Sequence, residues 1–255
     1  MLVENLKLKM IGIIGGTGFE KSDILKNPQV KEVDTIYGMP SSAIIIGSIN
    51  DKKVALLSRH GHEHTITPSN VNNRANIAAL KLLGCNYIIA TTACGSLKEE
   101  FQPGEFVLLD QFIDFTKHRI NTFYDNFKPG EMKHCPMADP FSNVLRNKII
   151  QAVDLCNLKI HKSGTMISIE GPRFSTRAES QMFKIWGADL INMSTAPETA
   201  LANEAEIPYA AIAIVTDYDC WKIDEKPVSI EIVLDNFSKS VTKLTEILIK
   251  TISIL

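Results

Sequence analysis

The feature that most constrains the fold is a repeated alternation between short apolar runs and segments of helical periodicity. The runs are rich in β-branched residues and end in clusters of Gly, Ser, Thr, Asp or Pro, which is typical of strands. Most are apolar throughout, as expected for strands that helices cover on both faces. We expect strands at residues 10–14, 43–46, 54–57, 87–92, 106–110, 165–169, 190–193 and 209–216.

Three helices can be located from local signals. After Ser69, apolar residues recur on one helical face until a glycine ends the pattern. Thr176 and Glu179 have the spacing of a capping box, which predicts the start of a second helix. Ser229 is a candidate N-cap for a third, long helix with apolar residues at intervals of three and four.

This alternation predicts one domain over residues 1–255, a three-layer α/β/α sandwich with a central mixed sheet. An Asn-Asp pair between two apolar runs predicts an antiparallel hairpin at residues 49–54. Residues 111–140 show neither the apolar run of a buried strand nor the periodicity of a helix. We therefore expect a long loop there, where a lid or binding loop could lie.

Length, charge and cysteine usage narrow the class of protein. A chain of 255 residues fits one large α/β domain. The formal charge of −2 provides no basic field for nucleic acid or an acidic membrane. The five cysteines form an odd set without a CxxC pair, which indicates a reducing compartment. The start lacks a signal-peptide core and no run approaches about 18 apolar residues, so we expect a cytoplasmic protein.

The first unusual loop follows the first strand, where residues 11–20 read IGIIGGTGFE. Glycines let backbone N–H groups approach an anion, and the Thr17 hydroxyl could add a donor. A dinucleotide motif would need a third glycine at Lys21, so that interpretation fails. A phosphate cradle and a plain tight turn both remain open.

The second loop, residues 58–64, reads SRHGHEH. Arg59 carries a planar fork of donors suited to phosphate, with His60 beside it. His60, His62 and His64 could instead share a metal ion, as in a metal-dependent hydrolase, although Glu63 stands where such a motif wants Asp. A polar surface loop is the third possibility.

The third loop reads ATTACGSL over residues 90–97. The Thr92 hydroxyl and the Ala93 amide could complete an anion cradle, or these small residues could simply pack in a strand. Cys94 has no evident base beside it, so we interpret it as a buried structural thiol.

The fourth loop reads TDYDCW over residues 216–221. In an extended chain Asp217 and Asp219 would point to the same side. They could form a turn. Alternatively, one carboxyl could stay ionised while burial keeps the other protonated, ready to protonate a basic leaving group.

These motifs together resemble the purine nucleoside phosphorylase family, in its methylthioadenosine phosphorylase branch. The most specific matches are GIIGGTGF, residues 59–79, TTACGSL, IEGPRFSTRAES, GADLINMS and TDYDCW. The resemblance implies a single α/β sandwich assembled as a homotrimer, or as a dimer of trimers. It also implies a phosphate site formed by Thr17, Arg59, His60, Thr92, Ala93 and Ser194.

The resemblance also implies where a nucleoside would bind. Met193 would lie against the ribose, Phe174 and Ser175 would line the base pocket, and Asp217 and Asp219 would read the purine edge and act in catalysis. The 5′-methylthio group would contact Ile230 and Val233, together with His134 of a neighbouring subunit.

The activity implied is phosphorolysis of S-methyl-5′-thioadenosine to adenine and 5-methylthioribose 1-phosphate, without a metal or cofactor. Relatives that prefer 6-oxopurines usually carry Asn at the first acidic position, because an amide can donate to the oxo group. Asp217 therefore favours a 6-aminopurine, with a 6-oxopurine nucleoside or methylthioinosine phosphorylase as the alternative.

Overall fold

The computed structural model describes residues 10–16, 24–225 and 228–255. Within these residues ten strands form one mixed sheet, in the order β2-β3-β4-β1-β5-β9-β8-β7, with β10 paired to both β5 and β6. The strands are β1 (Met10–Gly15), β2 (Lys26–Lys31), β3 (Ile44–Ile49), β4 (Lys52–Ser58), β5 (Cys85–Ser96), β6 (Phe106–Leu108), β7 (Gln111–Phe115), β8 (Thr165–Ile169), β9 (Leu190–Asn192) and β10 (Tyr209–Asp217).

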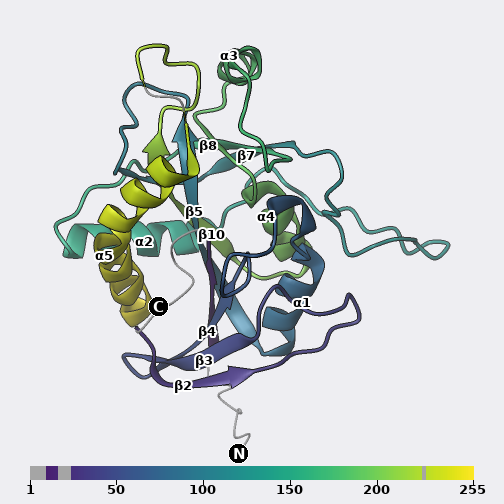
Figure 1. The fold of residues 1–255 in the computed structure, drawn as a ribbon. Coiled ribbons are helices and arrows are strands. Elements are labelled where there is room, and N and C mark those ends of the chain that lie inside the picture. Colours follow the sequence, from purple (N-terminus) through teal and green to yellow (C-terminus); the bar gives the residue numbers. More distant parts are fainter. Residues whose placement is uncertain (1–9, 17–23, 226–227) are drawn as a thin grey trace, which may run out of the picture.

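Helices cover both faces of this sheet, which gives the three layers expected from the sequence (Figure 1). They are α1 (Asn73–Leu82), α2 (Asn143–Leu155), α3 (Arg177–Ile185), α4 (Thr195–Glu204) and α5 (Ile230–Ile254), with a short 3₁₀ turn, η1 (Pro68–Asn70). Helices α2 and α5 lie on one face and α1 and α4 on the other, while α3 stands apart at the end of the molecule where the loops gather (Figure 1).

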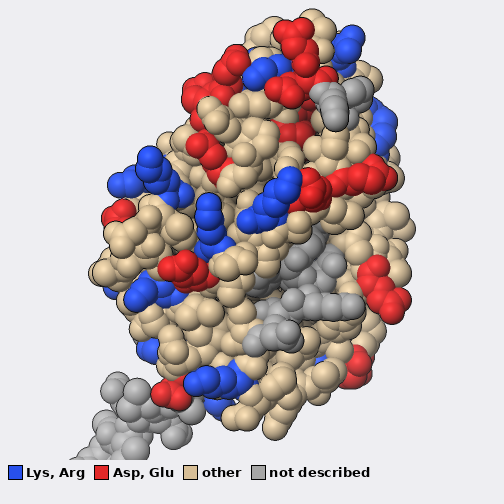
Figure 2. Space-filling model, turned by 60° about the vertical axis from the view of Figure 1, so that its left-hand side comes forward, with Lys and Arg blue, Asp and Glu red and all other residues tan. Residues whose placement is uncertain are grey.

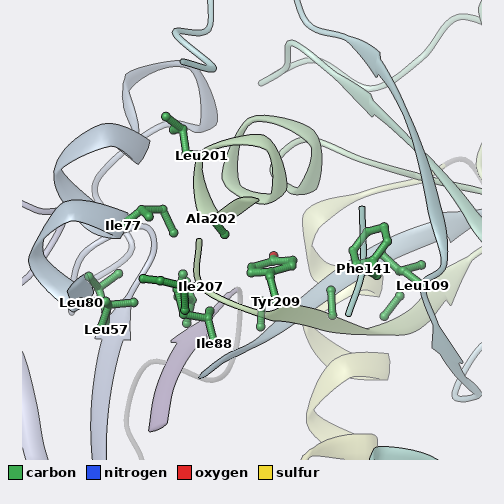
Figure 3. Close-up of a cluster of buried hydrophobic side chains, with 14 of the residues drawn as sticks. Leu57, Ile77, Leu80, Ile88, Leu109, Phe141, Leu201, Ala202, Ile207 and Tyr209 are labelled. Atoms are coloured by element: carbon green, nitrogen blue, oxygen red, sulfur yellow. The ribbon is translucent and has the colours of Figure 1, made fainter. Parts of the chain in front are cut away.

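Each face of the sheet buries its own apolar cluster. On the side of α1 and α4, Ile77 and Leu201 pack toward Ile88 and Tyr209 (Figure 3). On the opposite side, residues of α2 and α5 such as Phe237 pack against β1, β4 and β10. Burial on both faces explains why the strand sequences are apolar throughout.

Most of the sequence-based predictions are confirmed. All eight predicted strands are present, and β3 and β4 form the predicted hairpin around Asn50 and Asp51, both at positive φ. Thr176 and Glu179 form the predicted capping box, in which each side chain accepts the other residue's backbone N–H. The Ser229 hydroxyl accepts the Ile232 N–H at the start of α5.

Three predictions need correction. The strand expected at residues 87–92 continues to Ser96, so most of the loop expected at residues 90–97 belongs to β5. The helix expected after Ser69 begins only at Asn73, because residues 68–70 form the 3₁₀ turn and Asn72 supplies the N-cap. The segment 111–140 is not wholly irregular, because its first five residues form β7, parallel to β8. This strand was missed because its residues are mostly half-buried, so it lacks a fully apolar run.

The surface and the cysteines fit the composition. Acidic and basic side chains are interspersed over the face in Figure 2, although acidic ones gather at its upper end. All five cysteines are free thiols. Among the helices of the described residues, none has the length and apolar character needed to cross a membrane.

Candidate active site

A cavity of about 320 Å³ opens where the carboxyl ends of β4, β8, β9 and β10 meet the second half of β5. It brings together twelve of the residues expected to form a site: Arg59, His60, Thr92, Ala93, Phe174, Ser175, Met193, Ser194, Asp217, Asp219, Ile230 and Val233. Thr17 lies outside the described residues. His134 does not line the cavity and instead packs edge-on against Phe127.

One end of the cavity carries a cluster of hydroxyl groups. The Asn192 amide donates to Thr92 Oγ1 at 3.0 Å and to Ser194 Oγ at 3.4 Å. The Asn192 carbonyl oxygen in turn accepts the Ser168 hydroxyl at 2.8 Å. Because the Ser194 oxygen accepts from the amide, its hydrogen can be donated to an anion. The Thr92 hydroxyl donates to the Ala93 carbonyl at 3.1 Å and would have to turn from it to donate to an anion. Asn192 was not singled out from the sequence, although it lies in the run LINMS.

Helix α4 begins directly after this cluster, with Ser194 as its N-cap residue. The Ser194 side chain makes no capping hydrogen bond, so its hydroxyl is not committed to the helix. The N-terminus of a helix carries a partial positive charge that favours anions. The helix and the hydroxyl cluster therefore make the same end of the cavity suitable for an anion.

Arg59 lines this end of the cavity, but its planar fork is already occupied. Its Nε and Nη2 donate to the two carboxylate oxygens of Glu198 at 2.8 and 2.9 Å, and its Nη1 donates to the Thr91 carbonyl at 3.0 Å. A guanidinium has five N–H groups. Three are therefore used by these partners, which leaves two N–H groups of Arg59 for a further ligand.

Glu198 was missed because nothing local marks it. It is fully buried in α4, a helix without an apolar stripe, and its partner lies 139 residues away. A single acidic residue in the first turn of a helix is ordinarily a solvent-exposed stabiliser of the helix.

The glycine turn after β1 approaches the same guanidinium. A Cβ on Gly16 would lie 2.5 Å from Arg59 Nη1 and 2.8 Å from the Thr91 carbonyl oxygen. Glycine is therefore required at this position by close packing against Arg59 and Thr91, a reason that the sequence did not indicate.

His60 is a neutral residue of this site. Burial, followed by the charge of Arg59, lowers its pKa to about 4. Its Nδ1 lies 2.9 Å from the Ile66 carbonyl oxygen, which can only accept, so Nδ1 carries the proton and Nε2 is an acceptor. The His60 ring stacks on His64 with 4.5 Å between centroids.

The metal-hydrolase alternative finds no support in the side chains. His62 and His64 are exposed, unlike His60. In residues 10–16, 24–225 and 228–255, no three or more His, Cys, Asp or Glu side chains are grouped so that they could hold a metal ion.

Asp217 and Asp219 form one wall of the cavity. Asp217 Oδ2 accepts the Thr216 hydroxyl at 2.7 Å, and its Oδ1 accepts the Asp219 N–H at 2.8 Å. Burial raises the pKa of both carboxyls, and for Asp217 the neighbouring Asp219 charge raises it further. Both groups can therefore hold a proton at higher pH than ordinary carboxyls.

The reason why both carboxyls face the cavity differs from the expected one. Strand β10 ends at Asp217, and Asp219 has a φ of 49°, in the left-handed region that Asp tolerates. The pair is thus a side-chain turn as well as part of the cavity wall. Asp219 does not continue the extended chain, contrary to the prediction, although the two side chains do share the site.

The remaining wall is apolar. Ile230 and Val233, in the first turn of α5, line it together with Phe174 and Met193. Arg119 fixes the position of Met193: its Nη1 donates to the Met193 carbonyl at 3.1 Å while its Nε donates to Glu170 at 2.7 Å. Arg119 was not identified from the sequence, because it lies in the irregular segment after β7.

The cavity therefore has an end rich in hydrogen-bond donors, a wall with two protonatable carboxyls and an apolar wall. Such a cavity can hold an anion against a ligand that has a basic ring and an apolar substituent. It can supply a proton to the ring while the anion reacts.

Comparison with known proteins identifies the family of the chain. A model of the phosphorylase superfamily matches residues 10–253. The S-methyl-5′-thioadenosine phosphorylase of Xenopus tropicalis is 53% identical over 246 residues, which cover 95% of this chain and 87% of that protein. The protein of the same name from Danio rerio is 50% identical over 244 residues, with coverage of 95% and 87%.

Solved structures show the same fold. Methylthioadenosine phosphorylase from Schistosoma mansoni in complex with adenine superposes with a TM-score of 0.92 at 44% identity, covering 96% of this chain and 91% of that one. A mutant of the adenosine/methylthioadenosine phosphorylase of the same organism, in complex with methylthioadenosine, gives a TM-score of 0.90 at 44% identity, with coverage of 96% and 91%.

Lowering the pH from 7 to 5 should destabilise the protein through His60. An unfolded histidine titrates near 6.5 and the folded one at about 4, so in this window only the unfolded chain takes up the proton. We expect a loss on the order of 2 kcal/mol in the free energy of unfolding, measured by urea denaturation at both pH values.

The matched variant is His60→Asn, whose amide can still donate to the Ile66 carbonyl but does not titrate. Its loss in the free energy of unfolding between pH 7 and pH 5 should be smaller than that of the parent by about 2 kcal/mol. An equal loss in both proteins would contradict the assignment of a neutral, buried His60.

Proposed function

The chain belongs to the phosphorylase superfamily, and we propose that it is a pentosyltransferase that cleaves S-methyl-5′-thioadenosine with phosphate, giving adenine and 5-methylthio-α-D-ribose 1-phosphate. The observation that carries the proposal is the single cavity that combines a donor-rich end, two buried carboxyls of raised pKa and an apolar wall. Such a reaction would serve purine and methionine salvage.

Phosphate would bind at the donor-rich end. The hydroxyls of Thr92 and Ser194, held by Asn192, and the Ala93 amide would donate to it. Arg59 would contribute the N–H groups that Glu198 and Thr91 leave free. Thr17 and His60 complete the proposed set, with His60 Nε2 able to accept the hydrogen of HPO₄²⁻.

The nucleoside would extend from the phosphate along the two remaining walls. Asp217 and Asp219 would face the purine edge, with Phe174 and Ser175 around the base. Met193 would lie against the ribose, and Ile230 and Val233 would receive the apolar methylthio group. In the proposed assembly, His134 of a neighbouring subunit would complete this last pocket.

The reaction would be an inverting displacement through an oxocarbenium-like transition state. A phosphate oxygen forms a bond to C1′ as the C1′–N9 bond breaks, and the electron pair of that bond passes into the purine. Asp217 donates a proton to the ring. Phosphate loses its own proton on becoming an ester, so the protons balance once Asp217 is reprotonated. We propose that no metal or cofactor takes part.

We also propose a homotrimer, or a dimer of trimers, in the cytoplasm. Support for assembly comes from apolar side chains on the surface, such as Ile36 and Ile120, which are 92% and 57% exposed and line the same surface cavity. Exposed apolar residues gathered in one region indicate a protein interface. The five free thiols fit a reducing compartment.

The decisive experiment measures adenine release from methylthioadenosine with and without phosphate. We expect release that depends on phosphate and yields methylthioribose 1-phosphate in equal amount. Methylthioinosine, adenosine and inosine, assayed alongside, define the substrate range. Equal release in phosphate-free buffer would show a hydrolase instead.

Asp217→Asn tests the choice of purine. The amide cannot protonate the ring, so turnover of methylthioadenosine should fall by roughly 100-fold or more. Because an amide can donate to a 6-oxo group, the use of methylthioinosine relative to methylthioadenosine should rise. Asp224→Asn, an exposed acid in the same loop, is the control for a change of charge alone. An unchanged preference in Asp217→Asn would refute the role of Asp217.

Light scattering tests the assembly. Three copies of the 28.3 kDa chain weigh about 85 kDa, and a dimer of trimers about 170 kDa. Ile120→Asp should lower the mass, because it places a charge in the proposed interface. Ile185→Asp, at an exposed position on α3, should not. A parent protein of monomeric mass would exclude the proposal.

A further inference from the structure

The buried Arg59–Glu198 ion pair has a feature that phosphate binding does not explain. The two side chains are 2% and 0% exposed, and Glu198 takes the Nε/Nη2 edge of the guanidinium with both of its carboxylate oxygens. The Tyr209 hydroxyl donates a further hydrogen bond of 2.6 Å to Glu198 Oε1. The Glu198 carboxylate offsets the positive charge that Arg59 would otherwise present to phosphate.

The charges around the anion end come close to cancelling. Of the described residues that line the cavity, Arg59 is the only Lys or Arg. His60 is neutral, because its pKa is about 4. Arg119, which lies behind Met193, is paired with Glu170. The other donors at this end are neutral hydroxyl and amide groups.

This inference rests on the proposed reaction. In that reaction, a nearly neutral set of groups around the phosphate affects the transition state. An uncompensated guanidinium would bind phosphate more tightly in the ground state, but it would neutralise the charge that faces C1′. Positive charge develops at C1′ in the transition state, so a phosphate that keeps its charge stabilises that state. Tighter binding of the ground state alone does not raise kcat.

We propose that Glu198 acts on the reaction through Arg59, whose positive charge it cancels. Bound phosphate then keeps its negative charge for the transition state. Glu198 thereby lowers phosphate affinity and raises turnover. The alternative is that Glu198 only holds Arg59 in place. The two interpretations predict opposite changes in phosphate binding when the carboxylate is removed.

Glu198→Gln removes the charge with little change of shape. We expect phosphate to raise the melting temperature of this variant more than that of the parent, since the anion now compensates a buried guanidinium. We expect kcat at saturating phosphate to fall by roughly 10- to 100-fold while the KM for phosphate falls as well. Weaker phosphate binding, or an unchanged kcat, would overturn the proposal.

Two further variants separate charge from geometry. Tyr209→Phe removes one hydrogen bond to Glu198 and keeps both charges, so kcat and the KM for phosphate should stay near those of the parent. Glu198→Asp keeps the charge on a shorter side chain, so its kcat should exceed that of Glu198→Gln. Equal losses in the Asp and Gln variants would show that geometry, not charge, is what matters.

Two controls complete the design. If Glu198→Gln folds only in phosphate and not in sodium chloride of equal ionic strength, the proposal is supported. If Glu198→Gln folds in neither salt, Glu198→Asp provides the test. A kcat of Glu198→Asp more than about 100-fold below that of the parent would then overturn the proposal. A parent protein without phosphate-dependent adenine release would refute the proposed function itself, an outcome distinct from all of these.

Discussion

The site depends on strand β5 being hydrogen bonded to three other strands. It pairs in parallel with β1 over residues 85–90 and with β10 over residues 88–95, and its last two residues pair antiparallel with β9. Residues 92–95 therefore lie beyond the end of the pairing with β1, still beside β10, and the cavity opens over them. Gly95 is needed there, because a Cβ would lie 2.9 Å from Asp217 Oδ1 and 3.0 Å from Ile191.

Much of this architecture could be predicted because it is encoded locally. A strand buried on both faces needs an apolar run, and a helix start needs a cap such as Ser229 or the Thr176–Glu179 box. The candidate site followed from the same reasoning. Polar residues at the ends of buried strands, such as Arg59 after β4 and Asp217 at the end of β10, had to gather at the sheet edge.

The residues that were missed act through contacts between distant parts of the chain. Asn192 orients Thr92 from 100 residues away, and Glu198 binds Arg59 from 139 residues away. No spacing rule links such pairs before the fold is known. Helix α4 was missed for a related reason: it is buried on nearly every side, so it lacks the one-sided pattern that marks a surface helix.

The buried charged groups of the cavity contribute little to the stability of the fold or lower it. Burial raises the pKa of Asp217 and Asp219, so stability from these two groups is lost as the pH rises from about 3.8 through their folded values. A buried ion pair such as Arg59–Glu198 also gains little net stability, because both ions lose their hydration.

The packing on both faces of the sheet must offset these costs. Because the cavity draws residues from Arg59 to Val233 and from strands on both sides of β5, neither half of the chain could form it alone. The same continuous sheet that holds the core together also holds the reacting groups in place, which is why one domain of this size is sufficient.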